Sequence, residues 1–186
     1  MLTSLGQSLL DTWQTLPRRS DDQLPYWQDI KAEHLAPIMR HTWVLEYGAP
    51  FSMYIRFMGT EVARLGGKDT TGDDFLNTRI PADQRGYIMS IYDRCYRERC
   101  GVALTRIVSP LGCNTKQLCT TFLPLAHEAK DSWMLLGCSI MKSTDTSFNL
   151  DDSGTADYGT TRMWPPYFFD IGFGVPGLGD LKSRSA

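Results

Sequence analysis

The chain has 186 residues, a formal net charge of -2 and a hydrophobic fraction of 42%. This length suffices for one well-packed domain and is short for two. The near balance of charges excludes the clustered basic surface of a nucleic-acid-binding protein, and apolar runs no longer than a strand exclude a membrane-spanning helix.

Residues 2–16 predict an amphipathic helix at the N-terminus. Leucines and a tryptophan recur there at steps of three and four, which places them on one stripe, and Pro17 ends the pattern. The segment has no basic start followed by an apolar core, so it is not a secretory signal. We therefore expect a cytoplasmic protein whose five cysteines are reduced thiols.

Residues 27–40 predict a second helix, interrupted near Pro37. The alternating apolar runs at 42–47 and 51–58 predict two antiparallel strands. The residues between them, Gly-Ala-Pro at 48–50, are typical of a tight hairpin turn.

The middle of the chain predicts helices. Residues 60–65 indicate a short helical turn that a following Gly-Gly pair can end. Residues 81–99 predict the clearest helix, because Ile88, Ile91 and Cys95 share one apolar face.

Three more strands are expected at 102–108, 117–127 and 133–141. Pro124 cannot donate a ladder hydrogen bond, so it implies an edge or a bulge in the second of them. The third run is almost wholly apolar, which indicates a central strand covered on one or both faces.

This order of elements predicts an α+β fold. Strands joined by short turns pair antiparallel, so the five runs form a five-stranded antiparallel sheet, with helices on one face that leave a hollow. We divide the chain into an N-terminal helix and linker at 1–25, a domain at 26–143 and an extension at 144–186. The extension is first rich in Ser, Thr, Asp and Gly, which predicts flexibility, and ends in an aromatic tail.

The stretch RLGGKDTTGDD at 64–74 has the Gly-Lys pair of a phosphate-binding loop. A Walker loop aligned on that pair needs glycine where Val62 stands and a hydroxyl where Asp69 stands. A carboxylate at the second position would repel phosphate, so we expect no nucleotide site.

The motif order resembles that of the PAS domain family. The matching residues are RFMGTE at 56–61, GGKD at 66–69, TG at 71–72 and PADQR at 81–85. Together with LPRR at 16–19, the pattern is similar to bacterial, mostly single-domain PAS proteins, and the resemblance covers about residues 10–143.

The resemblance implies a PAS-like domain at 26–143 and a regulatory role in signal transduction. Helix 81–99 has no histidine for haem, and the Asn-Cys-Arg core of flavin photosensors is missing, so no cofactor is evident. The N-terminal helix is expected to pack on the outer face of the sheet or against the same helix of a second subunit, which would give a homodimer. Its candidate interaction residues are Leu5, Leu9, Trp13 and Leu16.

No metal site or catalytic residue is predicted. The cysteine spacings do not match those of zinc sites, and the three histidines form no ligand pair. No serine lies in a nucleophile elbow.

The hollow is either a filled core or a cavity for a small ligand. Its lining from strand 117–127 is either Cys119, Thr121 and Leu123 or Leu118, Thr120 and Phe122. Two of the candidate lining residues carry a phenol and a guanidinium, which need a partner when buried, and a ligand would supply one. The ligand-pocket candidates are Ile55, Phe57, Ile88, Tyr92, Cys95, Arg106 and Thr121.

The aromatic tail is too apolar for a simple linker, and its candidates are Trp164, Phe168 and Phe169. It could fold back on its own domain, bind a partner or reflect a groove elsewhere. We expect a non-enzymatic sensory protein that binds a small ligand, docks a signalling protein, or both. The alternatives are a cone-shaped isomerase or dehydratase, which needs a carboxylate facing the pocket, and a pure interaction module with a filled core.

Overall fold

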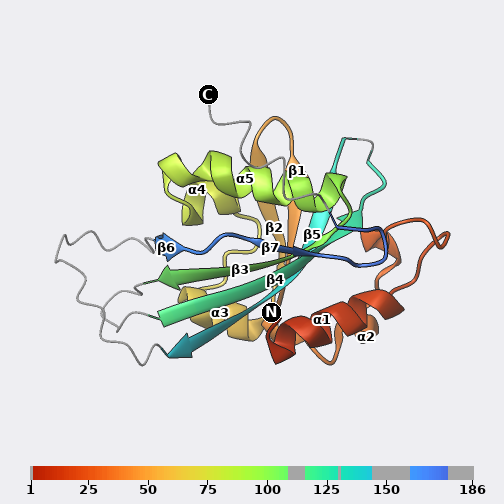
Figure 1. The fold of residues 1–186 in the computed structure, drawn as a ribbon, viewed down its shortest axis with the longest axis horizontal. Coiled ribbons are helices and arrows are strands. Elements are labelled where there is room, and N and C mark those ends of the chain that lie inside the picture. Colours follow the sequence, from red (N-terminus) through yellow and green to blue (C-terminus); the bar gives the residue numbers. More distant parts are fainter. Residues whose placement is uncertain (1, 109–115, 130, 144–159, 176–186) are drawn as a thin grey trace.

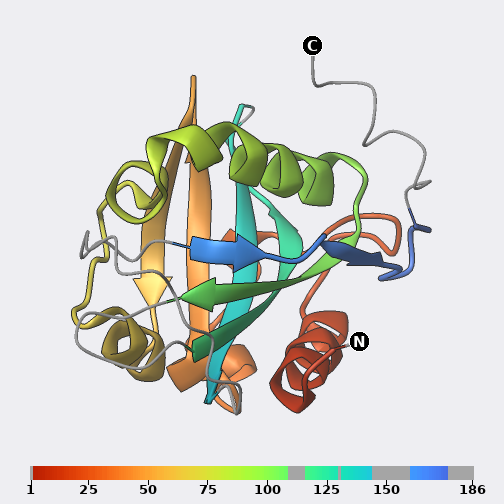
Figure 2. The same cartoon turned by 60° about the vertical axis from the view of Figure 1, so that its left-hand side comes forward.

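The computed structural model describes residues 2–108, 116–129, 131–143 and 160–175. These residues form one antiparallel sheet with helices on both of its faces (Figures 1 and 2). The strands are β1 (Thr42–Gly48), β2 (Ser52–Met58), β3 (Gly101–Val108), β4 (Lys116–Ala126), β5 (Trp133–Ser143), β6 (Thr160–Met163) and β7 (Tyr167–Phe169). The helices are α1 (Ser4–Thr15), α2 (Ala32–Leu35), α3 (Thr60–Gly66), α4 (Phe75–Arg79) and α5 (Ala82–Arg97), with short 3-10 turns η1 (Trp27–Asp29) and η2 (Met39–His41).

The sheet has the strand order β2-β1-β5-β4-β3-β6, and β7 also pairs with β3. The five predicted strands and their antiparallel pairing are confirmed. The α+β fold is likewise confirmed. The predicted helix at 27–40 is instead divided into η1, α2 and η2.

The inner face of the sheet is covered by α4 and α5 (Figure 1). The apolar side of α5 contributes Ile88, Ile91 and Cys95 to a buried cluster with Leu45 and Ile55 of the facing strands. This packing agrees with the helical spacing of these residues in the sequence.

The outer face carries a second core beneath α1. Thr3 caps the helix by accepting a hydrogen bond from the Gly6 backbone N–H at 3.0 Å. A side chain at Gly6 would place its Cβ 2.5 Å from Thr121 Oγ1, so glycine allows the helix to approach β4 closely. Leu9 and Trp13 are fully buried there.

Strand β5 lies between β1 and β4, and both of its faces are covered. Trp133 and Leu135 belong to the inner cluster, whereas Met134 and Leu136 belong to the outer one. This explains why its sequence is almost continuously apolar instead of alternating.

Pro124 lies in the interior strand β4 and not in an edge strand. The ladder between β3 and β4 ends at Phe122, so no β3 residue needs a donor at position 124. The Pro124 carbonyl accepts a hydrogen bond from Trp13 Nε1 at 3.0 Å. At Pro124, β4 therefore has β5 as its only strand partner among the described residues.

The tail extends the sheet beyond the five strands that we expected. β6 and β7 both pair with β3, and the Trp164 backbone N–H donates to the Thr105 carbonyl at 3.0 Å. Residues 160–175 therefore fold back on the domain, which is one of the three arrangements considered for the aromatic tail. Residues 144–159 and 176–186 of the extension lie outside the described residues.

The helices in the described part of the chain include none that is long and apolar enough to cross a membrane.

Candidate ligand cavity

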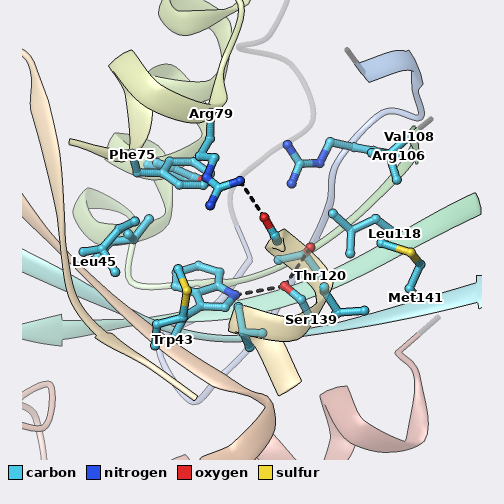
Figure 3. Close-up of a pocket in the computed structure, with 16 residues that line it drawn as sticks. Trp43, Leu45, Phe75, Arg79, Arg106, Val108, Leu118, Thr120, Ser139 and Met141 are labelled. Carbon is cyan, nitrogen blue, oxygen red and sulfur yellow. Dashed lines mark hydrogen bonds between the residues drawn. The ribbon is translucent and has the colours of Figure 1, made fainter. Parts of the chain in front are cut away.

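A cavity of about 140 Å³ lies between the inner face of the sheet and the helices that cover it. A single water molecule needs only about 10–15 Å³ of such space, so the cavity has room for a small organic molecule. Its lining residues are Trp43, Leu45, Ile55, Met58, Val62, Leu65, Gly66, Phe75, Arg79, Tyr92, Arg106, Val108, Leu118, Thr120, Ser139 and Met141 (Figure 3).

Three polar side chains on the sheet side of the cavity are linked by hydrogen bonds. Trp43 Nε1 donates a hydrogen bond to Ser139 Oγ at 3.0 Å, and the Ser139 and Thr120 hydroxyls are 3.3 Å apart (Figure 3). Gly137 makes room for the indole, since a Cβ there would lie 2.1 Å from Trp43 Cζ2. These contacts hold the indole in one orientation.

Arg106 extends from β3 into the cavity (Figure 3). Its Nε is buried and, among the described residues, has no hydrogen-bond partner. Burial lowers the pKa of Arg106 from its usual value, and the nearby Tyr92 opposes this shift. A guanidinium nevertheless stays charged in proteins, so the cavity contains a cation without a counter-ion in the described part of the chain.

Tyr92 reaches the cavity from α5 and is 3% exposed. Its ring packs edge-on against Phe122, with centroids 5.1 Å apart. Burial raises the pKa of Tyr92 to about 12, although the charge of Arg106 opposes the rise. The phenol is therefore neutral at physiological pH and can donate or accept a hydrogen bond.

Arg79 reaches the cavity from α4 (Figure 3). Its Nη1 donates to the Gly66 carbonyl at 3.1 Å, and its Nη2 donates to Thr70 Oγ1 at 3.4 Å. These bonds hold the guanidinium against the C-terminal end of α3, where Gly67 adopts a left-handed φ of 79°. Arg79 is thus a second cation at the cavity, with its donors directed at protein acceptors.

Three of the predicted pocket residues, Ile55, Tyr92 and Arg106, line the cavity. Ile88 and Cys95 lie in the inner cluster without lining it. Both belong to the same buried cluster as the lining residues Leu45, Ile55 and Tyr92.

The prediction for Phe57 is wrong because β2 contains a β-bulge. Val44 is opposite Phe57 and Leu45 is opposite Ile55, so Arg56 is the extra residue. One extra residue reverses the alternation, which turns Phe57 to the outer core and Met58 to the cavity.

The prediction for Thr121 is also wrong. Its side chain faces α1 on the outer side of the sheet, where it lies next to Gly6. Its neighbours Leu118 and Thr120 line the cavity instead, so the second of the two rows considered for this strand faces inward.

Most of the candidate interaction residues are buried within the chain. Leu9, Trp13 and Leu16 are at most 3% exposed, and Leu5 packs against the same outer core. Phe168 and Phe169 are 8% and 7% exposed, and Trp164 is half-buried. Their apolar surfaces serve the fold of this domain, and of the two placements expected for the α1 stripe the structure shows the packing on the outer face of the sheet.

The sequence analysis missed α4, which contributes Phe75 and Arg79 to the cavity. A signal was present, because Asp74 is a helix-capping residue and Pro81 marks the end of such a segment. The Asp74 carboxylate accepts a hydrogen bond from the Leu76 backbone N–H at 3.0 Å.

The described residues contain no cluster of His, Cys, Asp or Glu side chains that could hold a metal ion. The described cysteines Cys95, Cys100, Cys119 and Cys138 are free thiols. Burial raises the pKa of Cys100 and of Cys138 to about 12, so neither is a reactive thiolate at neutral pH.

Comparison with known families relates the chain to a sensory domain family. A family model described as a PAS domain matches residues 1–140. The match includes α1 and the strands β1 to β5 except the last three residues of β5, and it leaves out the tail strands β6 and β7. No curated protein matches the chain.

Proposed function

Since the chain belongs to the PAS domain family, we propose that it is a non-enzymatic protein that binds a small ligand in the cavity of the inner face. PAS domains in general have sensory or regulatory roles, so a ligand that alters this domain would act as a signal. The observation that carries the proposal is the cavity itself, which has a volume of about 140 Å³ and is bordered by Arg106, whose Nε has no hydrogen-bond partner among the described residues.

The strand β3 offers a route from the cavity to the tail. Arg106 projects from β3 into the cavity, and its backbone neighbour on the next strand is Met163 of β6. A ligand that shifts Arg106 would act on the strand to which the tail is attached. Such a ligand changes the position of the tail only if the domain has two alternative tail positions and the ligand binds one of these forms more tightly than the other.

We further propose that the signal is passed on to a protein partner in the cytoplasm. The four described cysteines are free, which fits a reducing compartment. The tail strands are the candidate output, because they lie at the edge of the sheet and pair only with β3 in the described part of the chain.

The two alternatives have less support. An enzyme of the cone-shaped isomerase type needs a carboxylate in its pocket, and no Asp or Glu occurs among the described residues that line the cavity. A pure interaction module needs a filled core, which a cavity of this size does not provide.

Native mass spectrometry tests the proposal. Protein incubated with the small-molecule fraction of a cell extract should show an added mass that disappears on denaturation. Leu118→Trp places an indole in the cavity and should abolish the added mass, whereas Gln117→Trp, on the opposite side of the same strand, should retain it. Equal native and denatured masses for the wild type would contradict small-ligand binding.

A further inference from the structure

The charge of the cavity is unbalanced. Arg106 is half-buried with its Nε fully buried, and no described residue accepts a hydrogen bond from this Nε or forms an ion pair with the guanidinium. Burial of an unpaired charge has a high free-energy cost, which a counter-ion in the cavity would offset.

The remaining polar groups at the cavity do not balance this charge. Tyr92, Thr120 and Ser139 are neutral, and the donors of Arg79 are directed at Gly66 and Thr70. The described lining residues include no carboxylate. The missing negative charge must therefore come from outside these groups.

The rest of the lining is apolar. Leu45, Ile55, Val62, Phe75 and Leu118 face the same space as Arg106. A ligand that fills it must combine an apolar body with a charged end. Arg106 is the cation that such an end would meet, because the donors of Arg79 are already directed at the Gly66 carbonyl and at Thr70 Oγ1. An apolar cavity of about 150 Å³ admits a benzene ring, so a six-membered ring is an appropriate size for that body.

Building on the proposed function, we infer that the ligand is a small organic acid with an apolar body and a single carboxylate, which Arg106 binds. A guanidinium matches a carboxylate through two parallel N–H···O bonds. The Tyr92 phenol lines the same cavity and is neutral, so it can donate a hydrogen bond to a carboxylate bound there.

Calorimetric titration of the full chain with three related probes tests the inference. Phenylacetate and phenylacetamide differ in charge but have the same ring, and phenyl phosphate carries the same ring with a more highly charged head. We expect phenylacetate to bind the wild-type protein at least tenfold more tightly than phenylacetamide, and more tightly than phenyl phosphate.

Variants assign this preference to Arg106. In Arg106→Gln, and in Arg106→Met as a second replacement, the ratio between acid and amide should fall below threefold. Arg97→Gln, which removes an exposed guanidinium paired with Asp93, should leave the ratio unchanged. The ratio in the wild-type protein decides the charge preference even if neither Arg106 variant folds.

The outcomes separate this inference from the proposed function. Equal binding of acid and amide would overturn the inference while supporting a small-ligand cavity. Tighter binding of phenyl phosphate would overturn the assignment to a carboxylate. Absence of phenylacetate binding would overturn the inference, and the native mass measurement would then decide the proposed function separately.

Discussion

Replacement of Trp13 tests whether α1 stabilises its own domain. The indole is fully buried, and its Nε1 donates to the Pro124 carbonyl at 3.0 Å. Truncation of a buried tryptophan to alanine costs about 3–5 kcal/mol. Typical domains have only about 5–15 kcal/mol of unfolding free energy, so Trp13→Ala should remove a large share of it.

Urea unfolding followed by circular dichroism measures this loss. With a slope of about 2 kcal/mol per molar urea, the midpoint should fall by about 1.5–2.5 M. The shift should be the same at low and high protein concentration, because α1 packs on β4 and β5 of its own chain and Trp13 donates to Pro124 of β4.

Two further variants separate the contributions. Gln14→Ala changes an exposed neighbour and should shift the unfolding free energy by less than about 0.5 kcal/mol. Trp13→Phe keeps much of the apolar contact but leaves the Pro124 carbonyl without its donor, which should cost about 1–3 kcal/mol.

A loss below about 1 kcal/mol for Trp13→Ala would refute the packing described for α1, because a buried side chain of this size cannot be removed so cheaply. A midpoint that depends on protein concentration in the wild type and not in the variant would also refute it. That result would place α1 between two subunits.

Three other predictions concern the tail, α5 and the cavity. Gly101→Ala would put a Cβ 2.2 Å from Phe169 Cζ, so β7 should detach and limited proteolysis within residues 160–175 should become faster; unchanged cleavage would argue against the contact. Gly86→Ala meets no atom within 4 Å and removes a helical glycine, so it should raise the unfolding free energy by about 0.5–1 kcal/mol in the same urea assay; a decrease would contradict the open surroundings of that position. The raised pKa of Tyr92, about 12, means that the folded state retains a proton that the unfolded state loses near pH 10, so stability should fall between pH 10 and 12. Two pKa units correspond to roughly 3 kcal/mol, and Tyr92→Phe should lack that part of the fall in pH-dependent urea unfolding; equal slopes for the two proteins would show that the phenol is solvated.

The regular elements followed from local periodicity. The strands and the helix around Ile88, Ile91 and Cys95 were predictable because each repeats its apolar residues at the period of its own backbone. Arg106 and Tyr92 were identifiable for a similar reason, since a charged or phenolic group in an apolar run needs a partner wherever it is buried.

The direction of side chains across the sheet was not predictable from these patterns. Both faces of β4 are covered, so the row with Leu118 and the row with Thr121 are about equally apolar, and neither one marks the cavity. The bulge at Arg56 leaves the alternation of β2 unchanged in the sequence but reverses which face the following residues occupy.

By itself, the sequence determined the type and order of the main elements and the presence of two polar groups that need a partner, because these depend on neighbouring residues along the chain. Only the tertiary structure decided that β6 and β7 complete the sheet, that α1 covers its outer face, and that Arg79 and Arg106 meet at one cavity. Those contacts join segments far apart in the sequence, and their geometry depends on how both faces of the sheet are packed.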